Sequence, residues 1–154
     1  MDASIREADE ALLKLSNAFI RNNRLAIKTA SVVVQRQARA KHKFRNRNGD
    51  AERAIETQFV SKLGIDVGFV RLNNKVALHA MLMHEGTKPH IIRAKNKKSL
   101  RWVTATGFAY AKSVKHPGTK ADPFLYDALD ACEARIDAIF ERYAQRTVME
   151  SGLA

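Results

Sequence analysis

The longest patterned segment of the chain is residues 4–40, which read SIREADEALLKLSNAFIRNNRLAIKTASVVVQRQARA. Apolar side chains recur there every seven residues, at Ile5, Leu12, Phe19, Ala26 and Val33. This spacing, widened by apolar neighbours, predicts one long amphipathic helix over residues 4–40. Ser4 followed by Glu7 fits a capping box for its first turn. Because such a helix has more apolar surface than one small core covers, we expect it to pack partly against another subunit.

The composition is that of a globular protein with a strong positive charge. The chain has 154 residues, of which 45% are apolar and 28% charged, and its formal net charge is +11. This length predicts a single domain, residues 1–154, with a real core. The lone Cys132 excludes a disulfide scaffold. With no signal-peptide segment and no apolar run near the ~18 residues of a membrane span, we expect a soluble protein made inside the cell.

The charge is divided into blocks. Residues 1–48 carry 11 basic and 4 acidic side chains, and residues 88–120 carry 9 basic and no acidic ones. Residues 121–154 carry 3 basic and 7 acidic side chains. Blocks of one sign indicate an electrostatic partner, most often nucleic acid, or simply a solvated surface.

The segment after the long helix mixes loop and helix signals. Residues 39–49 are rich in Lys and Arg and end on the turn signal Asn48-Gly49, which predicts a mobile basic loop. Residues 50–64 are predicted to form a short helix that Asp50 caps and Gly64 ends. Its apolar face is formed by Ile55, Phe59 and Leu63.

Residues 65–116 favour strands, because apolar and polar side chains alternate between turn signals. We expect sequential hairpins in one small antiparallel sheet. The expected strands are residues 65–69, 76–83, 91–92, 100–103 and 108–114, with a turn at 104–107. Segments 91–92 and 100–103 flank a polar loop and are expected to pair as a basic hairpin.

The C-terminal segment gives the clearest helix, residues 122–146. Asp122 is the expected cap, with Pro123 in the first turn. The apolar face comprises Leu125, Ala128, Leu129, Cys132, Ile136, Ile139, Phe140 and Tyr143, and acidic residues occupy the other face. The fold class is therefore α+β: a small antiparallel sheet with long N-terminal and C-terminal helices.

No motif predicts an active site. His84, Glu85, His90 and His116 are the only crowded candidates for a metal site, but they lack the spacing of known zinc motifs. We interpret these histidines as binding loop backbone and Cys132 as a core residue. Serine-nucleophile and Walker signatures are absent from the sequence. We therefore expect no enzyme activity, no metal and no cofactor.

Four short motifs carry a resemblance to a known family. Residues 84–92 read HEGTKPHII, 97–102 read KKSLRW, 114–120 read VKHPGTK and 123–129 read PFLYDAL. In this order they resemble the head–tail joining proteins of long-tailed bacteriophages, also called neck, tail-completion or minor tail-component proteins. The resemblance covers about residues 77–130. His79 and Ala94 depart from the family pattern, which has an aromatic residue and a proline at these positions.

The resemblance implies a structural virion protein at the head–tail junction, made in the host bacterial cytoplasm. Such proteins form a ring, suggested to be hexameric, between the head connector or adaptor and the tail-terminator or tail-tube proteins, and DNA passes through it. We interpret the motif residues as structural: His84, Glu85, Gly86, Thr87, Pro89, His90, Trp102, His116, Pro117, Gly118, Pro123 and Phe124. Gly86 and Gly118 suit positive φ angles, and Trp102, Phe108 and Phe124 are expected to anchor the core.

Two basic clusters are the candidate contacts to DNA or protein partners. The first comprises Arg36, Arg39, Lys41, Lys43, Arg45 and Arg47, and the second Lys95, Lys97, Lys98 and Arg101. Both suit salt-dependent phosphate contacts, and both equally suit an acidic helix of a neighbouring subunit. We favour protein partners for the first cluster and the DNA passage for the second. The alternative function is a free-standing basic nucleic-acid-binding protein.

Overall fold

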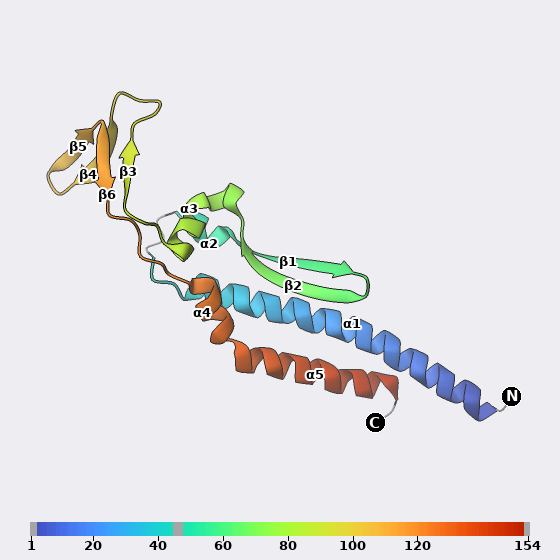
Figure 1. Cartoon of the computed structure of the whole chain (residues 1–154). Helices are drawn as coiled ribbons and strands as arrows, with labels where there is room; N and C mark the ends of the chain where they lie inside the picture. Colours follow the sequence, from blue (N-terminus) through green and yellow to red (C-terminus); the bar gives the residue numbers. More distant parts are fainter. Residues whose placement is uncertain (1–2, 45–47, 153–154) are drawn as a thin grey trace.

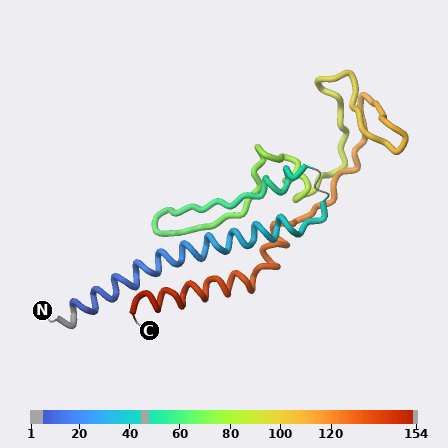
Figure 2. Tube along the Cα trace, turned by 180° about the vertical axis from the view of Figure 1, so that it is seen from behind, coloured from blue at the N-terminus to red at the C-terminus, as the bar shows by residue number. Residues whose placement is uncertain are grey.

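The computed structural model of the chain describes residues 3–44 and 48–152, with side chains from residue 6 onward. The molecule is elongated (Figure 1). Helix α1 (Ala3–Ala40) and helix α5 (Glu133–Ser151) lie side by side and antiparallel along most of its length in both views (Figures 1 and 2). The predicted long N-terminal helix is confirmed, whereas the capping box at Ser4 lies outside the described side chains.

The core lies where α1 meets α5 and the preceding helix α4 (Phe124–Asp130). Its buried members are Val34, Ala38, Ile55, Phe124, Ala128 and Cys132. Phe124 and Cys132 are completely buried, which confirms their predicted core roles. Farther along, the small residues Ala26 and Ala30 of α1 allow close packing against Ile139 of α5.

The predicted helix over residues 50–64 is wrong. Only α2 (Asp50–Arg53) is helical, and residues 55–62 form strand β1 (Ile55–Lys62). Asp50 is not the cap, because Gly49 occupies that position. Leu63 and Gly64, at φ 53° and 78°, form the tight turn into strand β2 (Ile65–Leu72). The four-residue apolar spacing suited a helix, but pairing with β2 along its whole length favours the strand.

The predicted strand over residues 76–83 is also wrong. Helix α3 (Asn74–Glu85) occupies this segment, and the side chain of Asn73 caps it by accepting a hydrogen bond from the amide of Lys75 at 3.0 Å. Ala77, Ala80 and His84 are buried at a helical spacing, and the two alanines pack against Ala51 and Ala54. The mid-helix residue Ala77 has non-helical angles, so the helix is kinked.

In the described part of the chain, the β segments form three two-stranded antiparallel sheets in place of the single predicted sheet. Pairing of residues 91–92 with 100–103 does not occur, because β3 (His90–Arg93) pairs with β6 (Ser113–His116). Between them lies the hairpin of β4 (Leu100–Thr104) and β5 (Gly107–Ala111), whose turn at 104–107 is confirmed. The predicted strand 108–114 is divided at Lys112. We call β3–β6, residues 90–116, the distal module.

Two predicted core aromatics lie on the surface. Trp102 is 40% exposed and Phe108 is 55% exposed, because none of the described helices covers the distal module (Figure 1). A two-stranded hairpin has no interior of its own, so its large side chains reach solvent unless another element packs on them.

The C-terminal helix is divided in two. Helix α4 ends at Asp130, and α5 begins at Glu133 and extends to Ser151, beyond the predicted end. Asp122 does not cap α4; its carboxylate accepts hydrogen bonds from the backbone amides of Lys43 and Phe44, at 2.6 and 3.2 Å. Pro123 occupies the cap position, one residue earlier than expected. Within the part of the chain that the structure describes, no helix combines the length and apolarity of a membrane span.

Candidate functional site

Residues of three of the four motifs, 84–92, 114–120 and 123–129, meet at the junction that joins the distal module to the helices. Two chain segments cross there, and Thr87 and Thr119 pair through backbone hydrogen bonds of 2.9 and 3.1 Å. Gly86 and Gly118 have positive φ angles of 76° and 89°, as predicted. A Cβ atom on Gly118 would stand 2.2 Å from the carbonyl oxygen of Thr87, so only glycine permits this approach.

The histidines of the motifs stabilise the junction. The ring of His84 is buried against the rings of Phe124 and Tyr126, with centroids 5.0 and 5.1 Å away. His90 Nδ1 lies 2.9 Å from the carbonyl oxygen of Lys88, and His116 Nδ1 accepts a hydrogen bond from the amide of Gly118 at 3.1 Å. Backbone bonding is thus confirmed for His90 and His116. Their rings lie 5.0 Å apart.

The remaining motif residues include three exposed ones. Glu85, Pro89 and Pro117 border the junction with their side chains toward solvent.

In residues 3–44 and 48–152, no group of three His, Cys, Asp or Glu side chains is placed to hold a metal ion.

The first basic cluster lies around the C-terminal end of α1. Arg39 donates to the carbonyl oxygen of Ile55 at 2.6 Å and so holds β1 against α1. Arg36, Lys41 and Lys43 are exposed. The other two members, Arg45 and Arg47, lie outside the described residues.

The second basic cluster is on the loop between β3 and β4. Lys95, Lys97 and Lys98 are exposed, and the loop borders an open hollow of about 680 Å³ that Arg101 and Tyr110 also line. This is a connection between two sheets, so the predicted basic hairpin loop is wrong in topology although its exposure is as expected. Its charges have no acidic neighbour in sequence from residue 88 to 120.

One face of the β4–β5 hairpin combines this charge with apolar side chains. Arg101 is paired opposite Tyr110, and Val103 opposite Phe108. Positions two apart on a strand share a face, so these four side chains form one surface, which we call the hairpin face. Val103 is 75% exposed, and the Arg101 guanidinium lies 4.4 Å from the Phe108 ring centroid, a cation–π contact that fixes its position.

A second surface, not foreseen from the sequence, is a groove of about 520 Å³ beside α1. Its walls come from β2, α1 and the α4–α5 pair, and its apolar lining is Ile27, Ala30, Val34, Val67, Phe69, Val70, Leu125, Tyr126, Leu129, Ile136 and Phe140. Asp130, Glu133 and Asp137 surround the adjoining hollow formed with Leu129 and Ile136. We call this surface the acid-rimmed groove. Among the described residues these three carboxylates have no ion-pair partner.

A further carboxylate, Asp66, lies in the groove wall. Its side chain is only 6% exposed, and Arg24 Nε lies 3.1 Å from Oδ2. The neighbouring Ser61 hydroxyl lowers the pKa of Asp66, burial opposes the change, and Arg24 adds to the lowering. The other oxygen, Oδ1, is buried with no hydrogen-bond donor in the described chain. Arg24 therefore balances the charge of Asp66 within the copy, and the unpaired negative charge beside the groove is that of its rim.

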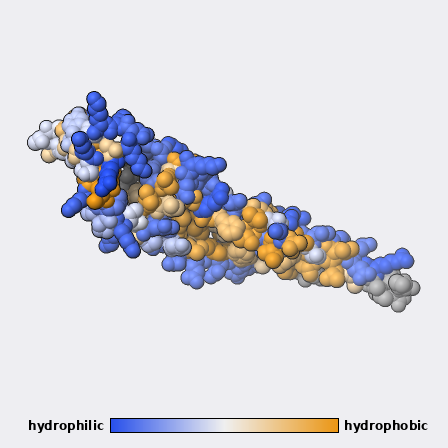
Figure 3. All heavy atoms as spheres, turned by 45° about the horizontal axis from the view of Figure 1, so that its top comes forward, coloured by the Kyte–Doolittle hydropathy of each residue, from blue (hydrophilic) through white to orange (hydrophobic). Residues whose placement is uncertain are grey.

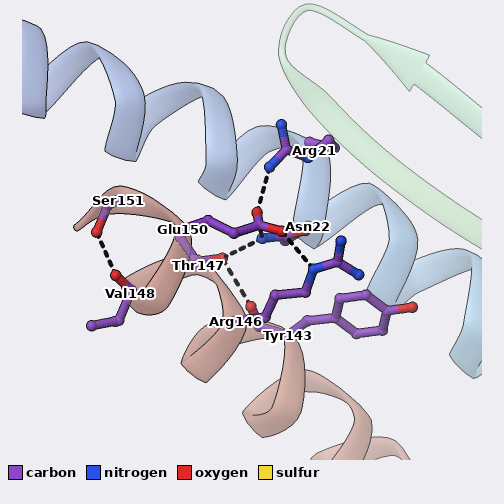
Figure 4. A network of polar contacts seen from close by, with 8 residues as sticks. All are labelled: Arg21, Asn22, Tyr143, Arg146, Thr147, Val148, Glu150 and Ser151. Carbon is purple, nitrogen blue, oxygen red and sulfur yellow. Dashed lines mark hydrogen bonds and ion pairs between the residues drawn. The ribbon is translucent and has the colours of Figure 1, made fainter. Parts of the chain in front are cut away.

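A polar network links α1 to the C-terminal half of α5 (Figure 4). The buried Asn22 donates to Thr147 Oγ1 at 3.1 Å and to Glu150 Oε2 at 3.0 Å. Arg21 and Arg146 both pair with the Glu150 carboxylate. The hydrogen bonds from Arg146, then Asn22 and Arg21, lower the pKa of Glu150 to about 2. This network fixes the register of the two helices that carry the groove.

The sequence held part of the signal for the groove. The apolar face of residues 125–143 was identified, and so were the acidic residues beside it. The contribution of β2 to the groove was not predicted, because its partner β1 was predicted to be a helix.

Comparisons of the chain with protein-family models, curated proteins and solved structures find no match.

Proposed function

We propose that this chain is a structural virion protein, a neck or tail-completion subunit that forms a ring joining a phage head connector to the tail. DNA passes through the ring during packaging and ejection. The observation that carries the proposal is the large apolar surface that a single copy leaves exposed. It includes Leu12, Leu13, Phe19 and Ile20 on α1 and Val67, Phe69, Leu129 and Phe140 in the groove. Patches of this extent mark assembly surfaces.

The placement of the motif residues supports the same proposal. Residues 84–87 and 116–124 are distant in sequence but pack into one junction, so the motifs act as one structural unit. The positive distal module suits a passage for DNA, because Lys and Arg contact phosphates without reading sequence. In this assignment Lys95, Lys97 and Lys98 face the DNA path. The subunit performs no catalysis and needs no cofactor or membrane partner.

Deletion of the gene from the phage that encodes it tests the proposal. We expect DNA-filled heads and separate tails by electron microscopy, with joined particles restored by the wild-type gene in trans. Mass spectrometry of purified virions is expected to detect the chain in a small, fixed copy number. Joined, infective particles without the chain would overturn the proposal.

A free-standing nucleic-acid-binding protein is the alternative, favoured by the basic loop alone. It predicts tight duplex DNA binding by the isolated chain, with a salt slope that falls by about 3 when Lys95, Lys97 and Lys98 are replaced by Glu. Strong binding by a chain absent from virions would favour this alternative.

A further inference from the structure

We propose that copies of this chain join through two unlike surfaces, with the hairpin face of one copy docked in the acid-rimmed groove of the next. The contact rests on the proposed function only for the expectation that the array closes into a ring. The pairwise contact itself is carried by the two surfaces described above.

Both surfaces expose large apolar side chains that could bury one another. The hairpin face presents Val103, Phe108 and Tyr110 to solvent, and the groove presents Tyr126 and Leu129 among its exposed apolar residues. Burial of both removes apolar area from water, the main driving force of association. Aromatic residues and Arg in the centre of a contact are also the side chains that contribute most to its affinity.

The charges are opposite as well. The hairpin face carries Arg101, positioned on the ring of Phe108, within a module of net positive charge. The groove carries the carboxylates of Asp130, Glu133 and Asp137 on its rim, and none of the three forms an ion pair within the described residues. A guanidinium has five donors and pairs well with such carboxylates. Complementary charge therefore selects the hairpin face as the occupant.

The two surfaces cannot meet within one copy. The distal module projects beyond the junction at one end of the molecule, whereas the groove lies along the helices (Figure 1). Apolar surface continues along the body almost to the end of α1, and the opposite end is mostly hydrophilic or intermediate (Figure 3). A contact between unlike surfaces is heterologous, and repetition of it closes a ring or extends a filament.

The competing occupant is the first half of α1 from a second copy, with its exposed Leu12 and Phe19. That segment carries acidic residues, Glu7, Asp9 and Glu10, beside its basic ones, so it has no charge preference for an acidic rim. The experiment below separates the two occupants.

The test uses two full-length variants and sedimentation velocity or native mass spectrometry. One variant carries Arg101→Ser and Phe108→Ser in the hairpin face, and the other Glu133→Lys and Asp137→Lys on the rim. We expect the wild type to form oligomers and each variant alone to stay monomeric, with a contact weakened at least ~30-fold, as for loss of an interfacial hot spot. An equimolar mixture is expected to give a heterodimer and nothing larger, because one intact hairpin face then meets one intact groove.

Matched controls keep the result interpretable. Lys75→Glu and Glu10→Lys make similar charge changes at exposed positions outside both surfaces and are expected to assemble as wild type. If Phe19→Ser abolishes assembly while Phe108→Ser retains it, α1 is the occupant and the proposal is overturned. Folding is checked independently by charge exchange: Arg101→Glu combined with Glu133→Lys in one chain is expected to restore assembly.

Other results contradict the contact directly. Assembly that persists in both variants, a mixture that stays monomeric, or a wild type that is monomeric at millimolar concentration each overturn it. Any of these with the chain still present in virions leaves the proposed function intact. Assembly through these two surfaces by a chain absent from virions overturns the function and leaves the contact.

Discussion

Gly118 at the junction offers the sharpest test of the fold, through the substitution Gly118→Ala. The residue has φ 89°, and an added Cβ would lie 2.2 Å from the Thr87 carbonyl oxygen and 2.9 Å from the Lys88 carbonyl carbon. Both neighbours are backbone, so the two segments must separate to make room. The pair of backbone hydrogen bonds between Thr87 and Thr119 is then lost.

The magnitude follows from these two effects. The left-handed conformation costs an alanine about 1 kcal/mol relative to glycine. Loss of the two hydrogen bonds costs about 1 kcal/mol each. The junction is therefore expected to lose about 3 kcal/mol of stability, a factor of roughly 100 or more in its opening equilibrium.

Hydrogen exchange followed by mass spectrometry measures this opening where it occurs. In Gly118→Ala, peptides that contain Thr87 and Thr119 are expected to exchange roughly 100-fold faster, since amide exchange follows local opening. Gly64→Ala is the matched control: Gly64 has φ 78°, but an added Cβ meets nothing within 4 Å. Its effect is expected to be about 1 kcal/mol and confined to β1 and β2.

The reasoning is refuted if the two variants have equal effects on their own segments. It is equally refuted if exchange at Thr87 and Thr119 is unchanged by Gly118→Ala. Either result means that the close approach of the two backbones does not hold the junction.

Three further predictions concern α4, α5 and the residues that connect them. Phe124→Ala, which empties a completely buried site, is expected to lower the free energy of unfolding by about 3–5 kcal/mol in urea denaturation, whereas exposed Tyr126→Ala changes it far less. Because the pKa of Glu150 is lowered from 4.5 to about 2, its stabilisation is complete above pH 4.5 and is lost as the pH falls toward 2. The urea midpoint of Glu150→Gln is therefore expected to depend less on pH across that window, and an unaltered dependence contradicts the network. The buried thiol of Cys132 is expected to react with a thiol reagent only in denaturant, and rapid labelling of the native chain contradicts its core position.

The apolar periodicity predicted the secondary structure correctly where its spacing fitted only one type of element. The seven-residue repeat of α1 extends over many turns, so its length and boundaries followed from sequence. The C-terminal segment was correctly predicted as helical, but its division into α4 and α5 and its end at Ser151 were not. The segments 50–64 and 76–83 were exchanged in type, helix for strand and strand for helix. In both segments the spacing of the apolar residues fits helix and strand alike, and such segments take the form that their neighbours can pair with or cover.

The candidate site likewise has parts that the sequence predicts and a part that it does not. The basic residues of the distal module and the acidic face of residues 127–141 are visible in the sequence, because charge is carried by residue type alone. The groove is not, because its walls come from three segments whose contact depends on the β1–β2 hairpin and on packing against α1.

The sequence by itself determined the α+β class, the two long helices and the separation of positive and negative charge. These features depend on neighbours a few residues apart and on composition. The tertiary structure decided which strands pair, where the chain closes its junction and which apolar faces stay uncovered. Those outcomes depend on contacts between distant residues, such as Thr87 with Thr119 and Asn22 with Glu150, whose geometry no local pattern contains.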